Sequence, residues 1–237
     1  MNNKVAIMQP YIFPYLGYFQ LIESVDHFVI YDDVNFIKQG WINRNNILQN
    51  GEALTFTIPL HKASSFSKIN EVEINLALYK KWERKFWKTI SQSYSKAPFY
   101  NDTRMLLEEV LTTPNSSISE LASNSILKVL EFLNISKAFS YSSESFNNSQ
   151  GLDKADRIIS ITKSLNSNYY INRLGGKSLY DKDYFKMKGI ELKFVESKLP
   201  LYNQFSHPFV KGLSIIDVLM FNAKDDIKFM FQQFELV

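Results

Sequence analysis

The sequence predicts an α/β protein with a largely parallel sheet and a helical insert. Its first three segments, "KVAIMQ", "YFQLIESVDH" and "FVIYDDV", read as strand, helix and strand, and such a βαβ unit places both strands in parallel in one sheet. Helical periodicity then dominates residues 79–134, before strand and helix patterns alternate again. We therefore expect a single domain over residues 1–237, with residues 79–134 as a helical insert or subdomain within it.

The remaining elements follow from local patterns. "ALTFTIPL" and "INEVEI" are expected to be strands that precede the insert, and "SISE" is a capping box at the start of the last insert helix. After the insert we expect a strand at "KAFSYSSE", a helix at "SQGLDKADRIISITKSL", a strand at "NYYINR", a turn at "LGGKSLY", a helix at "DKDYFKMKG", a strand at "IELKFVE" and two helical segments at "LSIIDVLMFNAKDDIKFMFQQF".

Composition narrows the class of function. The net charge of +3 comes from 27 basic and 24 acidic residues without a long basic run, so we expect no nucleic-acid partner. The chain has no cysteine, which excludes disulfides, Cys-ligated zinc and thiol nucleophiles. No window approaches the roughly 18 apolar residues of a membrane span, and the N-terminal apolar run is too short for a signal peptide. We expect a cytoplasmic location and no membrane insertion.

The first of three unusual clusters is "QPYIFPYLGYF", directly after the first strand. In an open parallel sheet, ligands bind beyond the carboxyl ends of the strands. Pro10 and Pro14 restrict the backbone of this loop, and Gly17 permits a close approach at the start of a helix, where free N–H groups can receive an anion. The amide of Gln9 needs hydrogen-bond partners that a ligand could supply. Tyr11 either contacts a ligand or caps the core.

The second cluster, "DDVNFIKQGWINRNN", follows the second strand. Asp32 and Asp33 are adjacent, so on a strand their side chains would point to opposite faces and would not form an acid/base pair. One of them could accept hydrogen bonds from sugar hydroxyls or an amine, could hold a metal, or could cap a turn or helix. Arg44 can hold a phosphate or carboxylate and Trp41 can stack on a ring, although Arg44 could instead pair with one of the two aspartates.

The third cluster, "NRLGGKSLY", follows a later strand. Its "LGGKS" part differs from a Walker A motif because Ile171 stands where that motif requires its first glycine. Gly175, Gly176 and Lys177 could form a phosphate-binding turn or an ordinary turn.

The chain has three histidines, His27, His61 and His207. No two have metal-ligand spacing, so we predict no histidine-based metal site. His61 ends a predicted strand beside a polar loop, and it is our candidate, with Asp32, for a general acid or base. His27 is expected to be structural, and His207 could have either role.

Four motifs occur in order: Q-P-x-x-x-P-x-L-G-Y-F, D-x-V-x-F, W-x-N-R-N and L-S-I-I-D. With them the chain resembles the WbqC-like protein family over nearly its whole length, apart from Gln39-Gly40, where a basic and a small polar residue are expected. The resemblance implies work on an amino sugar or nucleotide sugar in bacterial O-antigen or other surface-polysaccharide synthesis. The residues to which it points are Gln9, Pro10, Tyr11, Pro14, Gly17, Tyr18, Asp32, Asn43, Arg44, Asn45, Gly175, Gly176 and Tyr180.

The βαβ start is also similar to nucleotidyltransferase-like and Rossmann-like folds, but "PYLGYF" lacks both histidines of the H-x-G-H motif. No cofactor is assigned. We expect a transferase that acylates or aminoacylates a nucleotide-linked amino sugar, with His61 or Asp32 as the base. The alternative is a non-catalytic sugar-binding or assembly factor. The oligomeric state stays open, a homo-oligomer included.

Overall fold

A six-stranded sheet forms the centre of the computed structural model, which describes residues 3–112, 116–205 and 208–237. The strand order is β5-β2-β1-β6-β7-β8; the first five strands are parallel and β8 is antiparallel to β7. The strands are β1 (Lys4–Met8), β2 (His27–Ile30), β5 (Ala138–Tyr141), β6 (Tyr169–Arg173), β7 (Glu191–Ser197) and β8 (Phe234–Leu236). The prediction of an α/β protein with a largely parallel sheet is therefore confirmed.

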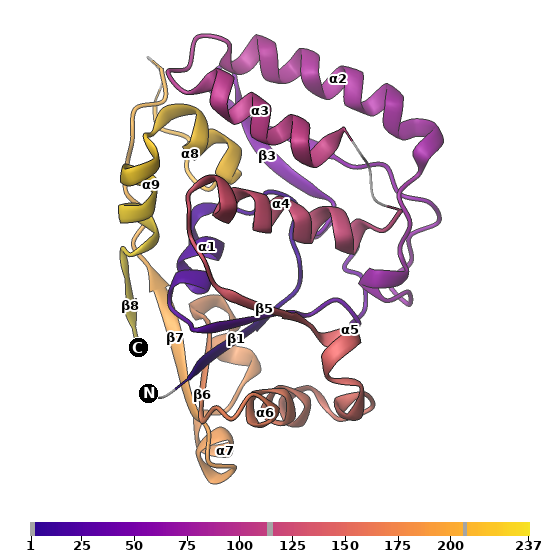
Figure 1. Ribbon diagram of the computed structural model, residues 1–237, viewed down its shortest axis with the longest axis vertical. Helices are drawn as coiled ribbons and strands as arrows, with labels where there is room; N and C mark the ends of the chain where they lie inside the picture. Colours follow the sequence, from indigo (N-terminus) through magenta and orange to yellow (C-terminus); the bar gives the residue numbers. More distant parts are fainter. Residues whose placement is uncertain (1–2, 113–115, 206–207) are drawn as a thin grey trace.

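Helices cover both faces of this sheet (Figure 1). One face carries α1 (Leu16–Glu23), α4 (Ile118–Phe132), α8 (Ile215–Phe221) and α9 (Lys224–Phe231). The other carries α6 (Lys154–Ser164) and α7 (Lys182–Met187). Two clusters of buried apolar residues pack on the two faces of the sheet. Neighbouring residues of a strand contribute to different clusters, since Ala6 belongs to the cluster that includes α1 and Val5 to the cluster that includes α6. Burial on both faces explains why the strands read as continuous apolar runs.

Most of the chain between β4 and β5 is helical from Leu76 onward. The helices α2 (Leu76–Tyr94) and α3 (Tyr100–Leu111) precede α4, and the three lie on the α1 side of the sheet (Figure 1). The short elements are η1 (Ile69–Glu71), α5 (Ser142–Ser145), η2 (Asn147–Ser149) and η3 (Leu174–Leu179). No helix within the described ranges is long and apolar enough to cross a membrane.

A hairpin that the sequence patterns did not predict joins β3 (Arg44–Gln49) to β4 (Glu52–Thr57). Its turn residues, Asn50 and Gly51, have φ angles of 52° and 80°, as a two-residue hairpin turn requires. The prediction of a strand at "INEVEI" is wrong. This segment begins with the 3-10 turn η1 and makes only isolated bridges, such as the one between Leu60 and Ile74. Buried Ile69 and Val72 are three residues apart, which suits a helical turn better than a strand.

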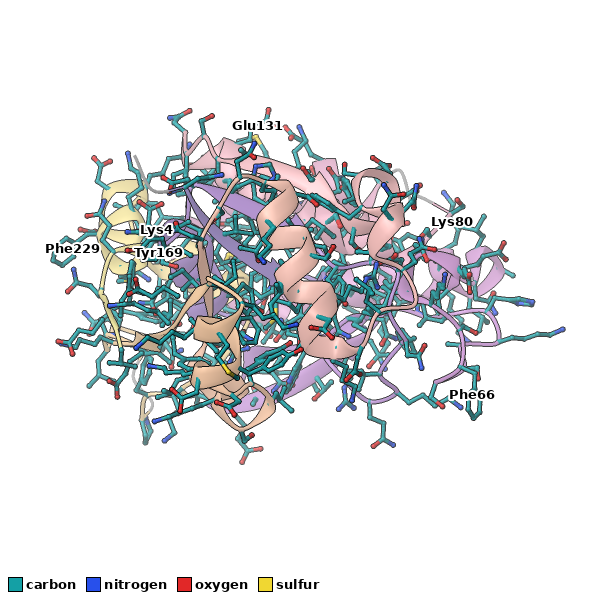
Figure 2. All side chains as sticks on the ribbon, turned by 90° about the horizontal axis from the view of Figure 1, so that it is seen from below. Lys4, Phe66, Lys80, Glu131, Tyr169 and Phe229 are labelled. Carbon is teal, nitrogen blue, oxygen red and sulfur yellow. The ribbon has the colours of Figure 1, made fainter. Side chains whose placement is uncertain are left out.

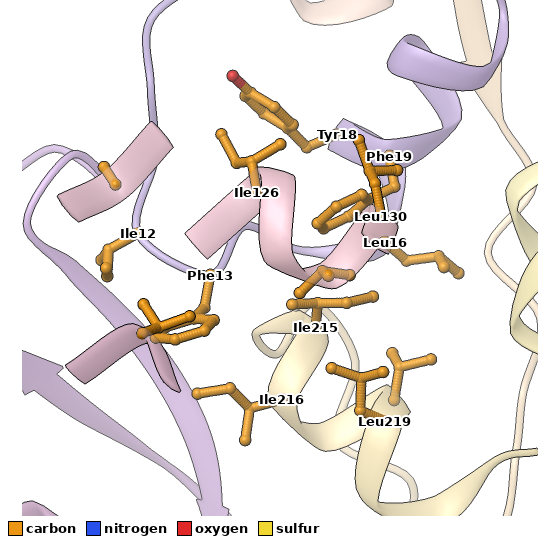
Figure 3. Packing of buried hydrophobic residues seen from close by; sticks show 14 of the residues in the cluster. Ile12, Phe13, Leu16, Tyr18, Phe19, Ile126, Leu130, Ile215, Ile216 and Leu219 are labelled. Carbon is orange, nitrogen blue, oxygen red and sulfur yellow. The ribbon is translucent and has the colours of Figure 1, made fainter. Parts of the chain in front are cut away.

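The loop between β1 and α1 is held at Phe13, whose backbone is left-handed, with φ of 41°. The Phe13 amide donates to Ser125 Oγ at 2.9 Å, and its carbonyl accepts from Asn45 Nδ2 at 2.8 Å and Ser214 Oγ at 2.7 Å. These bonds tie the loop to α4, β3 and the N-cap of α8. The Phe13 ring is fully buried with the apolar side chains of α1, α4 and α8 (Figure 3).

A buried carboxylate joins α8 to its surroundings. Asp217 has no exposed surface, and it accepts hydrogen bonds from Tyr94 at 2.8 Å, Tyr202 at 2.7 Å and Gln204 at 2.6 Å. Burial raises the pKa of Asp217, although the three donors partly offset this effect. The carboxylate thus links α2 and the segment after β7 to α8.

We expect Asp217→Asn to lower the free energy of unfolding by about 1–3 kcal/mol, because an amide cannot accept from all three donors. Since the folded-state pKa of Asp217 is raised, the advantage of the wild type over the variant is largest below the unfolded-state pKa and decreases as pH rises through the folded-state pKa. Urea unfolding at pH 4 and pH 7 measures both effects.

Asp225 provides the control with the opposite sign. Its bond to Lys228 lowers the pKa of Asp225, so its stabilising effect is present above the unfolded-state pKa and is lost as pH falls through the folded-state pKa. A wild-type advantage over Asp217→Asn that grows with pH, as expected for Asp225→Asn, would contradict the assignment.

Candidate functional site

A pocket of about 400 Å³ lies at the carboxyl ends of β1 and β6. The winding of the sheet reverses between these two strands, because the chain passes from β1 to β2 on one side and from β6 to β7 on the other. Open α/β sheets bind ligands at such a point. We call this pocket the switch pocket; it is lined by Ile7, Met8, Gln9, Tyr11, Tyr31, Ile37, Ile158, Asn172, Arg173, Gly175, Gly176, Leu179 and Tyr180.

Several hydrogen-bond donors in the switch pocket have no partner within the described residues. They are the side-chain amides of Gln9 and Asn172, the Tyr11 hydroxyl and the guanidinium of Arg173. Arg173 forms no ion pair with any described carboxylate, and the Asn172 side chain accepts, through Oδ1, a hydrogen bond from the Arg173 amide at 2.7 Å. These donors are chemically able to bind a polar or anionic group.

One aromatic ring, that of Tyr15, contacts the Arg173 guanidinium. The guanidinium lies 4.6 Å from the ring centroid of Tyr15, in a cation–π contact that fixes its position. Burial raises the pKa of Tyr11, and the positive charge of Arg173 only partly lowers it. Burial also raises the pKa of Tyr180. Both hydroxyls therefore remain protonated near neutral pH, and they can donate hydrogen bonds but cannot act as bases.

A buried ion pair supports one wall of the switch pocket. Arg157 Nη2 lies 2.5 Å from Asp33 Oδ2, and Gln150 Nε2 donates to the same oxygen at 3.2 Å. The guanidinium of Arg157 also lies 4.8 Å from the ring centroid of Tyr31, which lines the pocket. The pair thus holds the Tyr31 ring in place.

Asp32 and Asp33 lie beyond the end of β2 and not on a strand, so their side chains do not alternate as expected. Ser142 Oγ is 3.1 Å from Asp32 Oδ1 and 2.5 Å from Asp33 Oδ1. Asp32 also accepts from the Ser143 amide at 3.0 Å and the Ser143 hydroxyl at 2.7 Å. The carboxylate of Asp32 therefore binds the start of α5, and it is not a lining residue of the switch pocket.

Other residues of the first cluster shape the loop. Pro10 and Pro14 are buried, and the Tyr18 hydroxyl donates to the Gln9 carbonyl at 2.9 Å. A Cβ on Gly17 would lie 2.6 Å from the Tyr15 ring and 2.9 Å from Ser197 Oγ, so protein atoms fill the space beside this helix start. Gly17 permits the close approach of the Tyr15 ring, the ring on which Arg173 rests.

The W-x-N-R-N segment packs against this loop. Asn45 Nδ2 donates to the carbonyls of Ile12 and Phe13, and Asn43 Nδ2 donates to that of Ile58 at 2.9 Å. Arg44 bonds the carbonyls of Gln39 and Gly40 and lies 5.6 Å from the Trp41 ring centroid. None of the four predicted residues in this segment lines the switch pocket.

His61 is exposed on the loop after β4, where its amide donates to the Glu73 carbonyl at 2.8 Å, and it does not line the switch pocket. Lys177 is exposed on η3, the turn that brings Gly175 and Gly176 to the pocket. His27 Nε2 lies 2.8 Å from Ser140 Oγ, and His207 is outside the described residues.

The site just described lies in a region that family comparison also covers, since the sequence profile of the WbqC-like protein family matches residues 9–229. The chain belongs to the WbqC-like protein family. It is also 28% identical, over 224 residues, to the protein named "Uncharacterized protein Rv1507c" of Mycobacterium tuberculosis (strain ATCC 25618 / H37Rv), with 93% of this chain and 94% of that protein covered. No solved structure matches the chain.

Of the sequence-predicted residues in this WbqC-like chain, the structure brings five to the switch pocket: Gln9, Tyr11, Gly175, Gly176 and Tyr180. The third cluster included Asn172 and Arg173 at the end of the predicted strand "NYYINR", but no individual role was predicted for either residue. Sequence reasoning missed Tyr31 and the ion pair of Arg157 with Asp33. Arg157 carried no signal of this pairing, because it lies inside an ordinary amphipathic helix.

We expect Arg157→Met to lower the free energy of unfolding by about 3–5 kcal/mol, because it leaves the Asp33 carboxylate buried without its partner. Arg104→Met is the matched control: it removes an exposed pair with Glu108 and should leave the free energy of unfolding almost unchanged. Combining Arg157→Met with Asp33→Asn should recover part of the loss. Equal effects in the two single variants, measured by urea unfolding, would show that the Arg157 pair is not structural.

Proposed function

We propose that the protein is a transferase that acylates or aminoacylates the amino group of a nucleotide-linked amino sugar during bacterial O-antigen or other surface-polysaccharide synthesis. We place this reaction in the cytoplasm. The observation that carries the proposal is Arg173, a cation without an ion-pair partner among the described residues, held at the switch point of the sheet.

The chemistry of the pocket suits such a ligand. A nucleotide sugar combines a phosphate-borne negative charge with flat and sugar rings that carry many polar groups. Arg173 can hold a phosphate by two charge-assisted hydrogen bonds, and the amides of Gln9 and Asn172 can bond hydroxyl groups. Tyr11, Tyr31 and Tyr180 offer ring faces for packing.

The same groups can assist amide formation. Attack of an amine on an acyl carbon places negative charge on the carbonyl oxygen, and hydrogen-bond donors aimed at that oxygen stabilise the transition state. The Tyr11 hydroxyl, which burial keeps protonated, is our candidate donor. The amine must also lose a proton. His61 and Asp32 remain the candidates for the base, although neither lines the switch pocket.

A non-catalytic sugar-binding or assembly factor is the second candidate. It is favoured by one observation: the lining of the switch pocket, within the described part of the chain, includes no carboxylate and no imidazole. Such a protein would bind the same nucleotide sugar through Arg173 without turnover.

We expect Arg173→Gln to weaken the binding of a nucleotide-linked amino sugar by about 10- to 100-fold, since it removes charge-assisted hydrogen bonds to phosphate. Arg44→Gln is the matched control, because Arg44 bonds backbone carbonyls and not the pocket. Calorimetric titration of both variants measures the difference. If Arg44→Gln weakens binding and Arg173→Gln does not, the ligand site is on the W-x-N-R-N segment instead.

We expect His61→Ala to leave nucleotide-sugar binding within about twofold of the wild type, because His61 is exposed and outside the pocket lining. Mass spectrometry of the amide product then tests its role in turnover. Loss of product with intact binding would assign His61 as the base. Unchanged turnover would remove His61 from the mechanism.

A further inference from the structure

A second pocket, of about 340 Å³, adjoins the site and has a largely apolar lining. Residues 199–202, 209 and 211–213, which lie in the chain between β7 and α8, form part of its lining. The side chains that matter here are Tyr15, Leu16, Leu199, Tyr202, Leu213 and Val218. We call it the apolar pocket; its one charged lining residue in the described chain is Lys211.

Buried hydrogen bonds give the apolar pocket a defined shape. Tyr202 lines the pocket and donates to the buried Asp217 carboxylate at 2.7 Å, and Gln204 donates to the same oxygen at 2.6 Å. Gln204 Oε1 also accepts a hydrogen bond from the Val210 amide at 2.7 Å, and this bond links the two residues. A site formed before its ligand arrives loses less conformational freedom on binding, so this pocket is suited to hold a ligand.

A shared wall connects the two pockets. Tyr15 lines the apolar pocket, and the guanidinium of Arg173, which lines the switch pocket, lies 4.6 Å from the Tyr15 ring centroid. The switch pocket and the apolar pocket are therefore adjacent at the contact between Arg173 and Tyr15. A transferase needs two such neighbouring sites, one for the acceptor and one for the donor.

We infer that the apolar pocket holds the aliphatic acyl group of a thioester donor, while the acceptor amine occupies the switch pocket. This inference rests on the proposed function and names its donor. An aminoacyl group is a poorer fit, because its ammonium ion would be desolvated there without a free carboxylate. Asp217, the buried carboxylate nearby, is already bonded by three donors, and Lys211 would repel an ammonium ion.

The reaction then balances without a further reactant. The lone pair of the amine attacks the thioester carbonyl carbon, a C–N bond forms and the C–S bond breaks. The proton lost by the amine nitrogen ends on the departing thiolate, so the products are an amide and a thiol.

The test is calorimetric titration of the full chain with N-acetylcysteamine thioesters whose acyl groups have two to ten carbons. These probes carry no phosphate, so they report on the apolar pocket alone. We expect the affinity to rise about fourfold for each added methylene until the pocket is full. An affinity that does not change with chain length would overturn the inference.

Two variants locate the binding. Leu199→Gln should weaken octanoyl-probe binding about tenfold. Leu76→Gln should not; it is a matched control, since Leu199 is 46% exposed and Leu76, outside the pocket, is 53% exposed. Equal effects of the two would overturn the inference. So would a dimer, seen by light scattering, that Leu199→Gln dissociates while no probe binds.

Arg173→Gln separates this inference from the proposed function. It should weaken nucleotide-sugar binding by about 10- to 100-fold and leave octanoyl-probe binding unchanged. Probe binding without any nucleotide-sugar binding in the wild type would support the apolar site and contradict the proposed acceptor. Nucleotide-sugar binding without probe binding would do the reverse.

Discussion

The left-handed backbone at Phe13 is the constraint on which the arrangement of the site depends. A bulky residue in this conformation costs about 1–3 kcal/mol and persists only where the surroundings determine it. Here the amide and carbonyl of Phe13 are bound by Ser125, Asn45 and Ser214, which come from three separate elements. The ring fills the core between them (Figure 3). The loop after β1 can therefore take only one path, and that path sets Gln9, Tyr11 and Tyr15.

From this loop the site is built by contact. Gly17 permits the close approach of the Tyr15 ring to the start of α1. The Tyr15 ring in turn contacts the guanidinium of Arg173. The Tyr18 hydroxyl donates a hydrogen bond to the Gln9 carbonyl. The result is a set of hydrogen-bond donors that have no partner among the residues the structure describes. Such preorganisation lowers the free-energy cost of binding an anionic ligand. The side chains that reach the ends of the molecule, such as Phe66 and Phe229, take no part in it (Figure 2).

Two buried carboxylates stabilise the surroundings of the two pockets by different means. Asp33 is neutralised by Arg157, so its charge is balanced inside the protein. Asp217 has only neutral donors, and burial raises its pKa. The raised pKa of Asp217 links proton uptake to the stability of α8 and of its contacts with Tyr202 and Gln204. Each carboxylate acts on a pocket through a tyrosine, Tyr31 in one case and Tyr202 in the other.

The sequence by itself determined the α/β class and the parallel order of β1 and β2, because apolar periodicity and the βαβ crossover are local properties. It also placed Gln9, Tyr11, Gly175, Gly176 and Tyr180 near strand ends. It did not identify β3, because polar residues such as Asn45 occupy strand positions whose burial arises from contacts with the distant loop at Phe13. The "INEVEI" segment failed for a related reason: alternation alone does not supply a neighbouring strand.

Only the tertiary structure decided which cation lines the switch pocket. Arg44 is the first residue of β3 and Arg173 is the last residue of β6, and both have aromatic neighbours in the sequence. Folding directs Arg44 to backbone carbonyls and leaves Arg173 on the Tyr15 ring at the switch point. Likewise, the pairing of Arg157 with Asp33 joins residues 124 positions apart. Ion pairs and free charges of this kind depend on long-range proximity, which local periodicity does not encode.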